Sequence, residues 1–299
     1  MTGATGFVGA ATLDLALKEG MSVNALTRRP QPARAGVRWV PGALDDPDSL
    51  DSLLRDADVV LHIAGVVNAP DRQGFIDGNA KGTMFLVDAM RRSAVRRIVN
   101  VSSLAAREPD LSIYGWSKEL AERHVMASGL DWTIVRPPAI YGPGDRELLA
   151  LFRMAARGFM VLPPNGRLSI VEVSDLAHLL LALCEDRATS IARIYEVDDG
   201  QAGGRTYGEF AAAIGKAVGR PTLRTVFTPP WLLRGAAHAD RLIRRGNAKL
   251  TPDRARYFCH PDWVSNPEMT VPVALWRPSV SAATGLTRTA AAYRAQRLL

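Results

Sequence analysis

Short apolar segments alternate with stretches of helical periodicity through the first half of the chain. The apolar segments predict strands at Val23–Thr27, Val37–Val40, Val59–Ala64, Ile98–Val101 and Thr133–Arg136. Helical patterns lie before and between them, at residues 8–19, 48–56, 83–93 and 114–128. Because parallel strands need a crossover connection, this order predicts an α/β fold with a doubly wound parallel sheet.

The second half of the chain is less regular. A strand pattern returns at Ile194–Val197, and helical patterns follow at residues 207–218 and 230–245. A chain of 299 residues can bury one large core or two interleaved ones. We predict a sheet domain built from residues 1–140 plus 168–198. Residues 141–167 plus 199–299 are predicted to form a smaller C-terminal substrate-binding region.

Composition excludes several classes of protein. No apolar run approaches the ~18 residues of a membrane-spanning helix, and the N-terminus lacks the basic start and apolar core of a signal peptide. Cys184 and Cys259 lie far apart, which argues against a disulfide framework and suits a reducing compartment. Metal-ligand spacing is also missing among His124, His178, His238 and His260. We expect a cytoplasmic protein that holds no metal.

Positive charge is concentrated in one segment. The chain carries a net charge of +7, and residues 221–260 hold eight basic residues against Asp240 and Asp253. Such a segment can face phosphate or an anionic membrane surface, and it can equally be a solvated helix face. Apolar residues are interleaved with the arginines from Phe227 onward. The functional interpretation is a peripheral contact with the inner face of a membrane, and we expect no nucleic-acid partner.

Gly3, Gly6 and Gly9 form a G-x-x-G-x-x-G turn that leads into the first helical stretch. Glycine permits the tight turn and the close approach of the backbone to a pyrophosphate, and the helix N-terminus offers free N–H groups. The motif therefore predicts a Rossmann-type dinucleotide site. Only Met1 and Thr2 precede Gly3, where such a unit has a strand of ~5–6 residues. We expect that the true start lies upstream or that the first strand is shortened.

Two arginines, Arg28 and Arg29, follow the predicted strand Val23–Thr27, where an acidic residue would pair with the ribose hydroxyls of NAD. Guanidinium groups suit the 2′-phosphate of NADP in charge and in geometry. We therefore favour NADP(H), with Arg28 as the better candidate, and keep NAD(H) as the alternative. The structural interpretation is that both are exposed loop arginines.

Tyr114 and Lys118 lie four residues apart at the start of a predicted helix, so both project from one face. A phenol has a reference pKa of ~10, and a nearby ammonium lowers that value. Tyr114 can then exchange a proton with a substrate oxygen while a nicotinamide handles the hydride. Ser103 follows a predicted strand, where its hydroxyl can hold the same oxygen; Ser102 is the neighbouring alternative.

These motifs resemble those of the extended short-chain dehydrogenases/reductases, in the broad epimerase/dehydratase group. The likeness spans nearly the whole chain. It rests on residues 2–9, His62–Gly65, Asn79 with Gly82–Thr83, Val101–Ser103, Tyr114 with Lys118, Arg136–Gly144, Val171–Asp175 and the tail from Trp276 to Arg294. The resemblance implies that Ser103, Tyr114 and Lys118 are catalytic. It implies that the cofactor is lined by Gly3, Thr5, Gly6, Phe7, Val8, Gly9, Arg28, Leu44, Ala64, Gly65, Asn79, Tyr114, Lys118, Pro137 and Ile140.

Some positions depart from the pattern of that family. Ala43 replaces a frequent aspartate, and Ala139 stands where sugar-nucleotide members usually carry asparagine. Ala139, together with Arg28 and Arg29, favours an NADPH-dependent carbonyl reductase over a sugar-nucleotide enzyme. Its substrate would be apolar or a lipid, for example a 3-oxo sphingolipid or ceramide or a sterol-like ketone. The alternatives are a nucleotide-sugar epimerase with tightly bound NAD and a non-catalytic NAD(P)H-binding subunit. By analogy with relatives, residues 83–93 and 114–128 would pair two copies into a homodimer.

Overall fold

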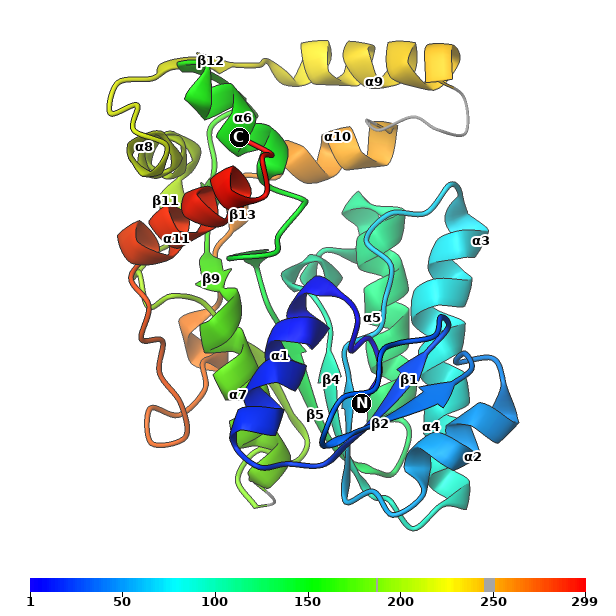
Figure 1. Cartoon of the computed structure of the whole chain (residues 1–299). Helices are drawn as coiled ribbons and strands as arrows, with labels where there is room; N and C mark the ends of the chain where they lie inside the picture. The colour runs from blue at the N-terminus through cyan, green and yellow to red at the C-terminus, as the bar shows by residue number, and fades with distance from the viewer. Residues whose placement is uncertain (187, 245–250) are drawn as a thin grey trace. The chain divides into compact units, whose positions relative to one another are not determined.

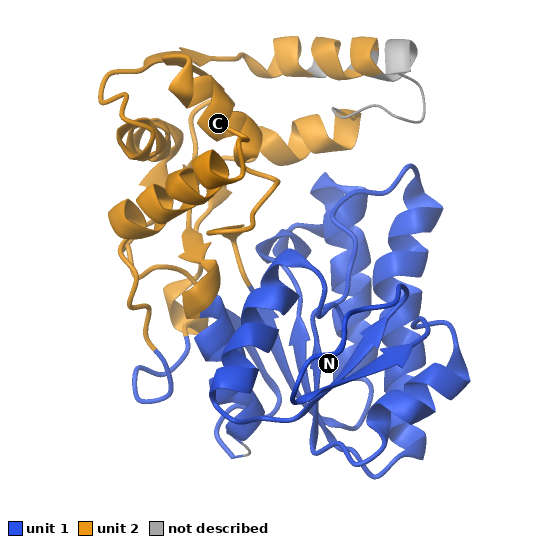
Figure 2. Cartoon of the chain, viewed as in Figure 1, with its two compact units in different colours: residues 1–136, 176–196, 271–276 blue, residues 137–175, 197–270, 277–299 orange. Residues whose placement is uncertain are grey.

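The computed structural model describes residues 1–186, 188–244 and 251–299. It divides into two compact units, shown in Figure 2. Unit 1 comprises residues 1–136, 176–196 and 271–276, and unit 2 comprises residues 137–175, 197–270 and 277–299. These bounds differ from the predicted domains, whose functional division stays a prediction. The predicted basic residues Arg245 and Lys249 lie outside the described residues.

Unit 1 is built on parallel strands. The main sheet has the order β10 (Arg193–Glu196), β5 (Asp131–Arg136), β4 (Arg97–Val101) and β3 (Val59–His62). A second pair joins β1 (Val23–Thr27) to β2 (Val37–Pro41). All these pairings are parallel, as the alternating pattern predicts.

The first two residues lie between the two groups of strands. The Thr2 amide donates to Leu61 O at 3.0 Å, and the Ile63 amide donates to Thr2 O at 3.3 Å. On the other side, the Leu26 amide donates to Met1 O at 3.1 Å. Met1 and Thr2 therefore join β3 to β1, and the glycine turn starts at the middle of the unit 1 strands.

Helices cover both faces of these strands (Figure 1). On one face lie α1 (Phe7–Lys18) and α7 (Val173–Glu185); on the other lie α2 (Pro47–Leu54), α4 (Gly82–Arg92) and α5 (Ile113–Met126). Buried residues of the second face, including Leu50, Leu86 and Met90, pack with Ile98 and Ile134 of the strands. This is the predicted doubly wound Rossmann-type fold, in which aliphatic side chains from helix and strand close one core.

Unit 2 contains short strands and five helices among its described residues. Its strands pair as β6 (Ala139–Tyr141) with β9 (Ile170–Glu172), β7 (Phe159–Leu162) with β12 (Arg224–Phe227), and β8 (Arg167–Leu168) with β11 (Arg205–Thr206) and β13 (Asp262–Trp263). The helices are α6 (Leu149–Ala156), α8 (Tyr207–Ala217), α9 (Pro230–Arg244), α10 (Pro252–Phe258) and α11 (Ala282–Ala295). At the start of α7, Asp175 accepts hydrogen bonds from the Ser279 and Val280 amides, so it ties the chain before α11 to that helix.

Two features were not predicted from the sequence. The strands of unit 2 are two to four residues long, and segments of that length carry too few residues to show a period. In unit 1, α3 (Arg72–Phe75) leads through a wider π-helical segment, η1 (Ile76–Lys81), directly into α4. Such segments are frequent at functional sites, and η1 carries Asn79.

Candidate active site

The glycine turn forms a cradle of backbone atoms at the start of α1. Gly3 adopts φ of +73°, and a Cβ there would lie 2.7 Å from the Ala64 amide nitrogen. A Cβ on Gly9 would lie 1.9 Å from Gly3 O, so neither position admits a side chain. The first helical turn has no side-chain cap at Gly6 and no acidic residue. Its free N–H groups and positive dipole end therefore fit the pyrophosphate of a dinucleotide.

The other predicted residues of this turn lie around the cradle. Thr5 and Gly6 are exposed, while Phe7 and Val8 at the start of α1 are half-buried. Leu44 is half-buried after β2, and its side chain lies against the start of α4, where a Cβ on Gly82 would meet Leu44 Cδ1 at 2.8 Å. Their contacts with a cofactor stay predictions.

His62 is held inside a chain of hydrogen bonds that fixes the loop after β3. Its Nδ1 lies 2.7 Å from Thr2 Oγ1, and its Nε2 lies 2.9 Å from Thr83 Oγ1. The Thr83 hydroxyl donates to Asn79 O, so it accepts from His62 Nε2–H, and Nδ1 accepts from the Thr2 hydroxyl. Thr2 Oγ1 also accepts from the Ala64 amide at 3.2 Å. His62 is therefore a packed residue that positions Ala64.

We expect His62 to make stability depend on pH. Burial, aided by the charge of Lys118, lowers the pKa of His62 to about 3. Between pH 6.5 and 3, His62 is protonated in the unfolded chain but neutral in the folded chain. The free energy of unfolding therefore decreases as the pH falls below 6.5. Urea unfolding at pH 7 and pH 4 should differ by about 3 kcal/mol from this group. In His62→Gln this difference should shrink by that amount.

The matched control for this measurement is His178→Gln, because the His178 side chain is exposed. The control should retain the pH dependence of the unmodified chain. A His62→Gln protein whose stability still falls as steeply between pH 7 and pH 4 would contradict the role given to His62.

Asn79 ties the loop at Val66 to helix α5. Its Oδ1 accepts from the Val66 amide at 2.8 Å, and its Nδ2 donates to Val66 O at 3.0 Å and to Ser117 Oγ at 2.9 Å. A Cβ on Gly65 would lie 2.9 Å from Asn79 Oδ1 and 3.5 Å from Lys118 Nζ. The structure therefore brings together Gly65, Asn79 and Lys118. It shows Asn79 holding the loop, while its predicted contact with the cofactor stays a prediction.

Ser103 and Tyr114 lie on two short segments that pack against each other. Ser103 caps η2 (Leu104–Arg107), its Oγ accepting from the Ala105 amide at 3.2 Å. A Cβ on Gly115 would lie 2.5 Å from Ala105 O, so the first turn of α5 rests directly on η2. Tyr114 in that turn lies beside Phe75, with 6.2 Å between ring centroids.

The two candidate serines differ in their surroundings. The Ser102 side chain is buried, and its hydroxyl has no hydrogen-bond partner among the described residues. Ser103 is half-buried. Ser103 is thus the more accessible of the two hydroxyls, which favours it as the group that meets a substrate.

Lys118 lies buried behind Tyr114 on the same helix. Its ammonium donates to Val101 O at 2.9 Å. Burial lowers the pKa of Lys118 to about 8, and the carboxylate of Glu122 opposes this shift. At neutral pH the ammonium is therefore mostly protonated, yet closer to losing its proton than an exposed lysine. A buried ammonium with such a pKa is suited to proton transfer.

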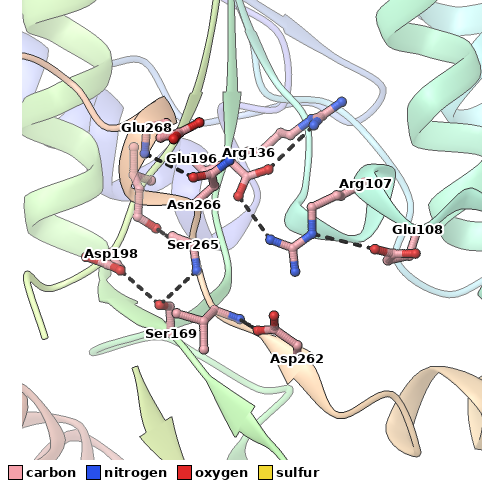
Figure 3. Close-up of polar contacts among 12 residues, drawn as sticks. Arg107, Glu108, Arg136, Ser169, Glu196, Asp198, Asp262, Ser265, Asn266 and Glu268 are labelled. Atoms are coloured by element: carbon pink, nitrogen blue, oxygen red, sulfur yellow. Dashed lines mark hydrogen bonds and ion pairs between the residues drawn. The ribbon is translucent and has the colours of Figure 1, made fainter. Parts of the chain in front are cut away.

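A chain of ion pairs with two buried carboxylates, which we call the Glu122–Arg107 network, connects α5 to η2. Arg136 at the end of β5 donates to both carboxylate oxygens of Glu122, at 2.9 and 2.6 Å. Arg136 also lies 3.5 Å from Glu196 at the end of β10, and Glu196 accepts from Arg107 at 3.2 Å (Figure 3). This network was not predicted from the sequence, although the position of Glu122, one helical turn after Lys118, indicates that the two side chains share a face of α5.

Arg28 stands just past the end of β1. The Thr27 side chain closes a turn around Arg28. Its Oγ1 donates to Arg29 O at 2.7 Å and accepts from the Arg29 amide at 3.3 Å. Both arginines are exposed. The Arg28 guanidinium makes no hydrogen bond or ion pair with the residues that the structure describes, so it is available to an anion.

The remaining predicted cofactor residues belong to unit 2. Pro137 is buried, and Ile140 on β6 pairs with Val171 of β9. Their place at the cofactor stays a prediction. Over residues 1–186, 188–244 and 251–299, no cluster of three metal-binding side chains occurs. In the same part of the chain, every helix is too short or too polar to cross a membrane.

Comparison with known proteins gives consistent matches. The family described as NAD(P)H-binding matches residues 3–186. Ceramide reductase of Caulobacter vibrioides is 35% identical over 307 residues, covering 99% of this chain and 94% of its own. Sterol demethylase protein B of Methylococcus capsulatus is 30% identical, covering 84% of each chain. The solved structure of human epimerase family protein SDR39U1 with NADPH has a TM-score of 0.75 at 18% identity, covering 97% of this chain and 98% of that one.

The family match covers more than half of the chain, and it includes the glycine cradle and the Tyr114–Lys118 pair. The relatives are named as reductases, dehydrogenases and epimerases. This chain belongs to the extended short-chain dehydrogenases/reductases, in the epimerase/dehydratase group, and is an NAD(P)-dependent oxidoreductase.

Proposed function

We propose that this chain is an NADPH-dependent reductase that converts the ketone of an apolar, lipid-like molecule into a secondary alcohol. A 3-oxoceramide is the specific candidate. The observation that carries the proposal is the similarity to ceramide reductase, which extends over 99% of this chain. The alanine at position 139, where sugar-nucleotide members usually carry asparagine, supports an apolar substrate over a nucleotide sugar.

Ser103, Tyr114 and Lys118 each contribute differently to this reaction. The glycine cradle would hold the dinucleotide, which when bound would supply the hydride for the carbonyl carbon. The Ser103 hydroxyl holds the carbonyl oxygen, and the Tyr114 phenol gives its proton to that oxygen as the alcohol forms. The Lys118 ammonium stabilises the phenolate that remains, and its proton can replace the one that Tyr114 has given.

Preference for NADPH rests on Arg28. An unpaired guanidinium past the end of β1 suits a 2′-phosphate, and a charge-assisted hydrogen bond contributes roughly 1.5–3 kcal/mol. Arg28→Ala should therefore weaken NADPH binding by about 10- to 100-fold and leave NADH binding within about twofold. Fluorescence titration of nucleotide-stripped protein measures both affinities. Arg29→Ala is the matched control and should change the ratio of the two affinities much less.

The proposed function is tested by nucleotide analysis followed by turnover. We expect exchangeable NADPH to be oxidised in the presence of detergent-dispersed 3-oxoceramide, and a nucleotide sugar to be left unchanged. Tightly retained NAD, combined with isomerisation of a nucleotide sugar, would replace the reductase by an epimerase. Binding of NADPH without turnover of any ketone would instead favour a non-catalytic subunit.

A further inference from the structure

Exposed apolar side chains are concentrated at one place in unit 2. They are Phe159 and Val161 on β7, Val226 on β12, and Trp231 and Leu232 at the start of α9, and we call them the β7–β12 patch. These five are among the eleven large apolar side chains that are exposed in the described residues. Single exposed apolar residues are ordinary, whereas a contiguous group marks a surface that contacts something.

The register of β7 and β12 places the strand residues of the patch on one face of the strand pair. Val161 pairs with Val226, and Phe159 pairs with Arg224, in a parallel ladder. Directly paired residues point to the same side of a sheet, so these four side chains share one face. The Thr228 amide donates to Leu162 O at 2.9 Å, which keeps the chain beside β7 until just before α9. Trp231 lies three residues later, within about 11 Å of that point.

The charge around the patch is positive. Residues 216–244 carry six basic residues and one acidic residue, Asp240. Arg224 is exposed on the same face as Val161 and Val226, and Lys216 and Arg220 are exposed nearby in sequence. If two copies of the chain associated through this patch, their positive charges would face each other. The resulting repulsion argues against self-association. An anionic surface would complement it.

We propose that the β7–β12 patch binds the surface of an anionic lipid bilayer. Trp231 is 71% exposed, and tryptophan with arginine is the composition of segments that rest at a membrane interface. The apolar side chains enter the boundary between headgroups and acyl chains, and the arginines meet lipid phosphates. This membrane-binding proposal rests on the proposed function in one respect: the proposed lipid ketone would reach the chain from such a bilayer.

Co-sedimentation of the full chain with vesicles tests the proposal. We expect binding to vesicles of phosphatidylcholine mixed with phosphatidylglycerol, and much weaker binding to phosphatidylcholine alone. Trp231→Ser combined with Leu232→Ser should weaken binding to the mixed vesicles by about tenfold. Arg224→Gln should weaken it by about fivefold and should not change the weak binding to phosphatidylcholine.

The control is Val273→Ser, because Val273 is 76% exposed and lies in unit 1. It should bind vesicles as the unmodified chain does, and every variant should keep its affinity for NADPH and its melting temperature. Three results would overturn the proposal: no binding to the mixed vesicles, equal binding by the patch variants, or an equal loss in Val273→Ser. Capture of an acidic protein in place of vesicles would likewise assign the patch to a protein partner.

Failure of this proposal is separable from failure of the proposed function. Reduction of a short-chain, water-soluble 3-oxo amide can be measured without vesicles. Reduction of this ketone without vesicle binding would support the proposed function and contradict the membrane-binding proposal. Vesicle binding through the patch without reduction of any ketone would support the membrane-binding proposal and contradict the proposed function.

Discussion

Replacing Tyr114 by phenylalanine should lower turnover about a thousandfold and leave the affinity for NADPH within about twofold. The change removes one hydroxyl and keeps the ring beside Phe75, so the first turn of α5 and its contact with η2 should persist. Without the phenol, the proposed donor of the proton to the substrate oxygen is missing. Single-turnover kinetics with a saturating ketone measure the loss, and fluorescence titration measures the cofactor affinity.

The control for Tyr114→Phe is Tyr195→Phe, because Tyr195 is a buried tyrosine of the same unit. It should retain turnover within a few-fold. If Tyr114→Phe turned over as fast as the unmodified chain, Tyr114 would not be the proton donor. The chain would then have to use another acid, and the assigned roles of Ser103 and Lys118 would fall with it.

Breaking the Glu122–Arg107 network should have the largest effect on stability. Arg136→Met removes the partner of Glu122, which is 1% exposed, and leaves a carboxylate buried without its counter-charge. Removal of one partner from a buried pair costs roughly 3–5 kcal/mol. Urea unfolding at pH 7 should show this loss. Arg123→Ala, on the same helix as Glu122, is the control. The Arg123 side chain is 68% exposed, so its ion pair with Glu119 should contribute at most about 1 kcal/mol.

Glu122→Gln separates a positioning role from simple stability. The carboxylate of Glu122 raises the pKa of Lys118 against the effect of burial, so its removal should lower that pKa further below about 8. Activity that needs the Lys118 ammonium would then decline at a lower pH on the alkaline side of the profile. A destabilised variant with an unmoved pH profile would show that Glu122 only holds the fold together.

The sequence predicted most of unit 1 because its elements are long enough to show a period. The strands at 23–27 and 97–101 and the helices at 7–18 and 113–126 lie within two residues of their predicted bounds. The glycine turn and the Tyr114–Lys118 spacing were recognisable because their chemistry is local. The Glu122–Arg107 network could not be recognised from the sequence, because Glu122, Arg136 and Glu196 come together only when β5 and β10 are paired.

The attachment of Val66 through its main chain also constrains how related sequences can differ. Asn79 contacts the amide and the carbonyl of Val66, which every residue except proline would offer. The contact with Asn79 therefore does not restrict which side chain occupies position 66. The size of that side chain is restricted by Gly78, where a Cβ would lie 2.7 Å from Val66 Cγ2. Positions 66 and 78 should accordingly vary as a pair during divergence, while position 79 stays fixed.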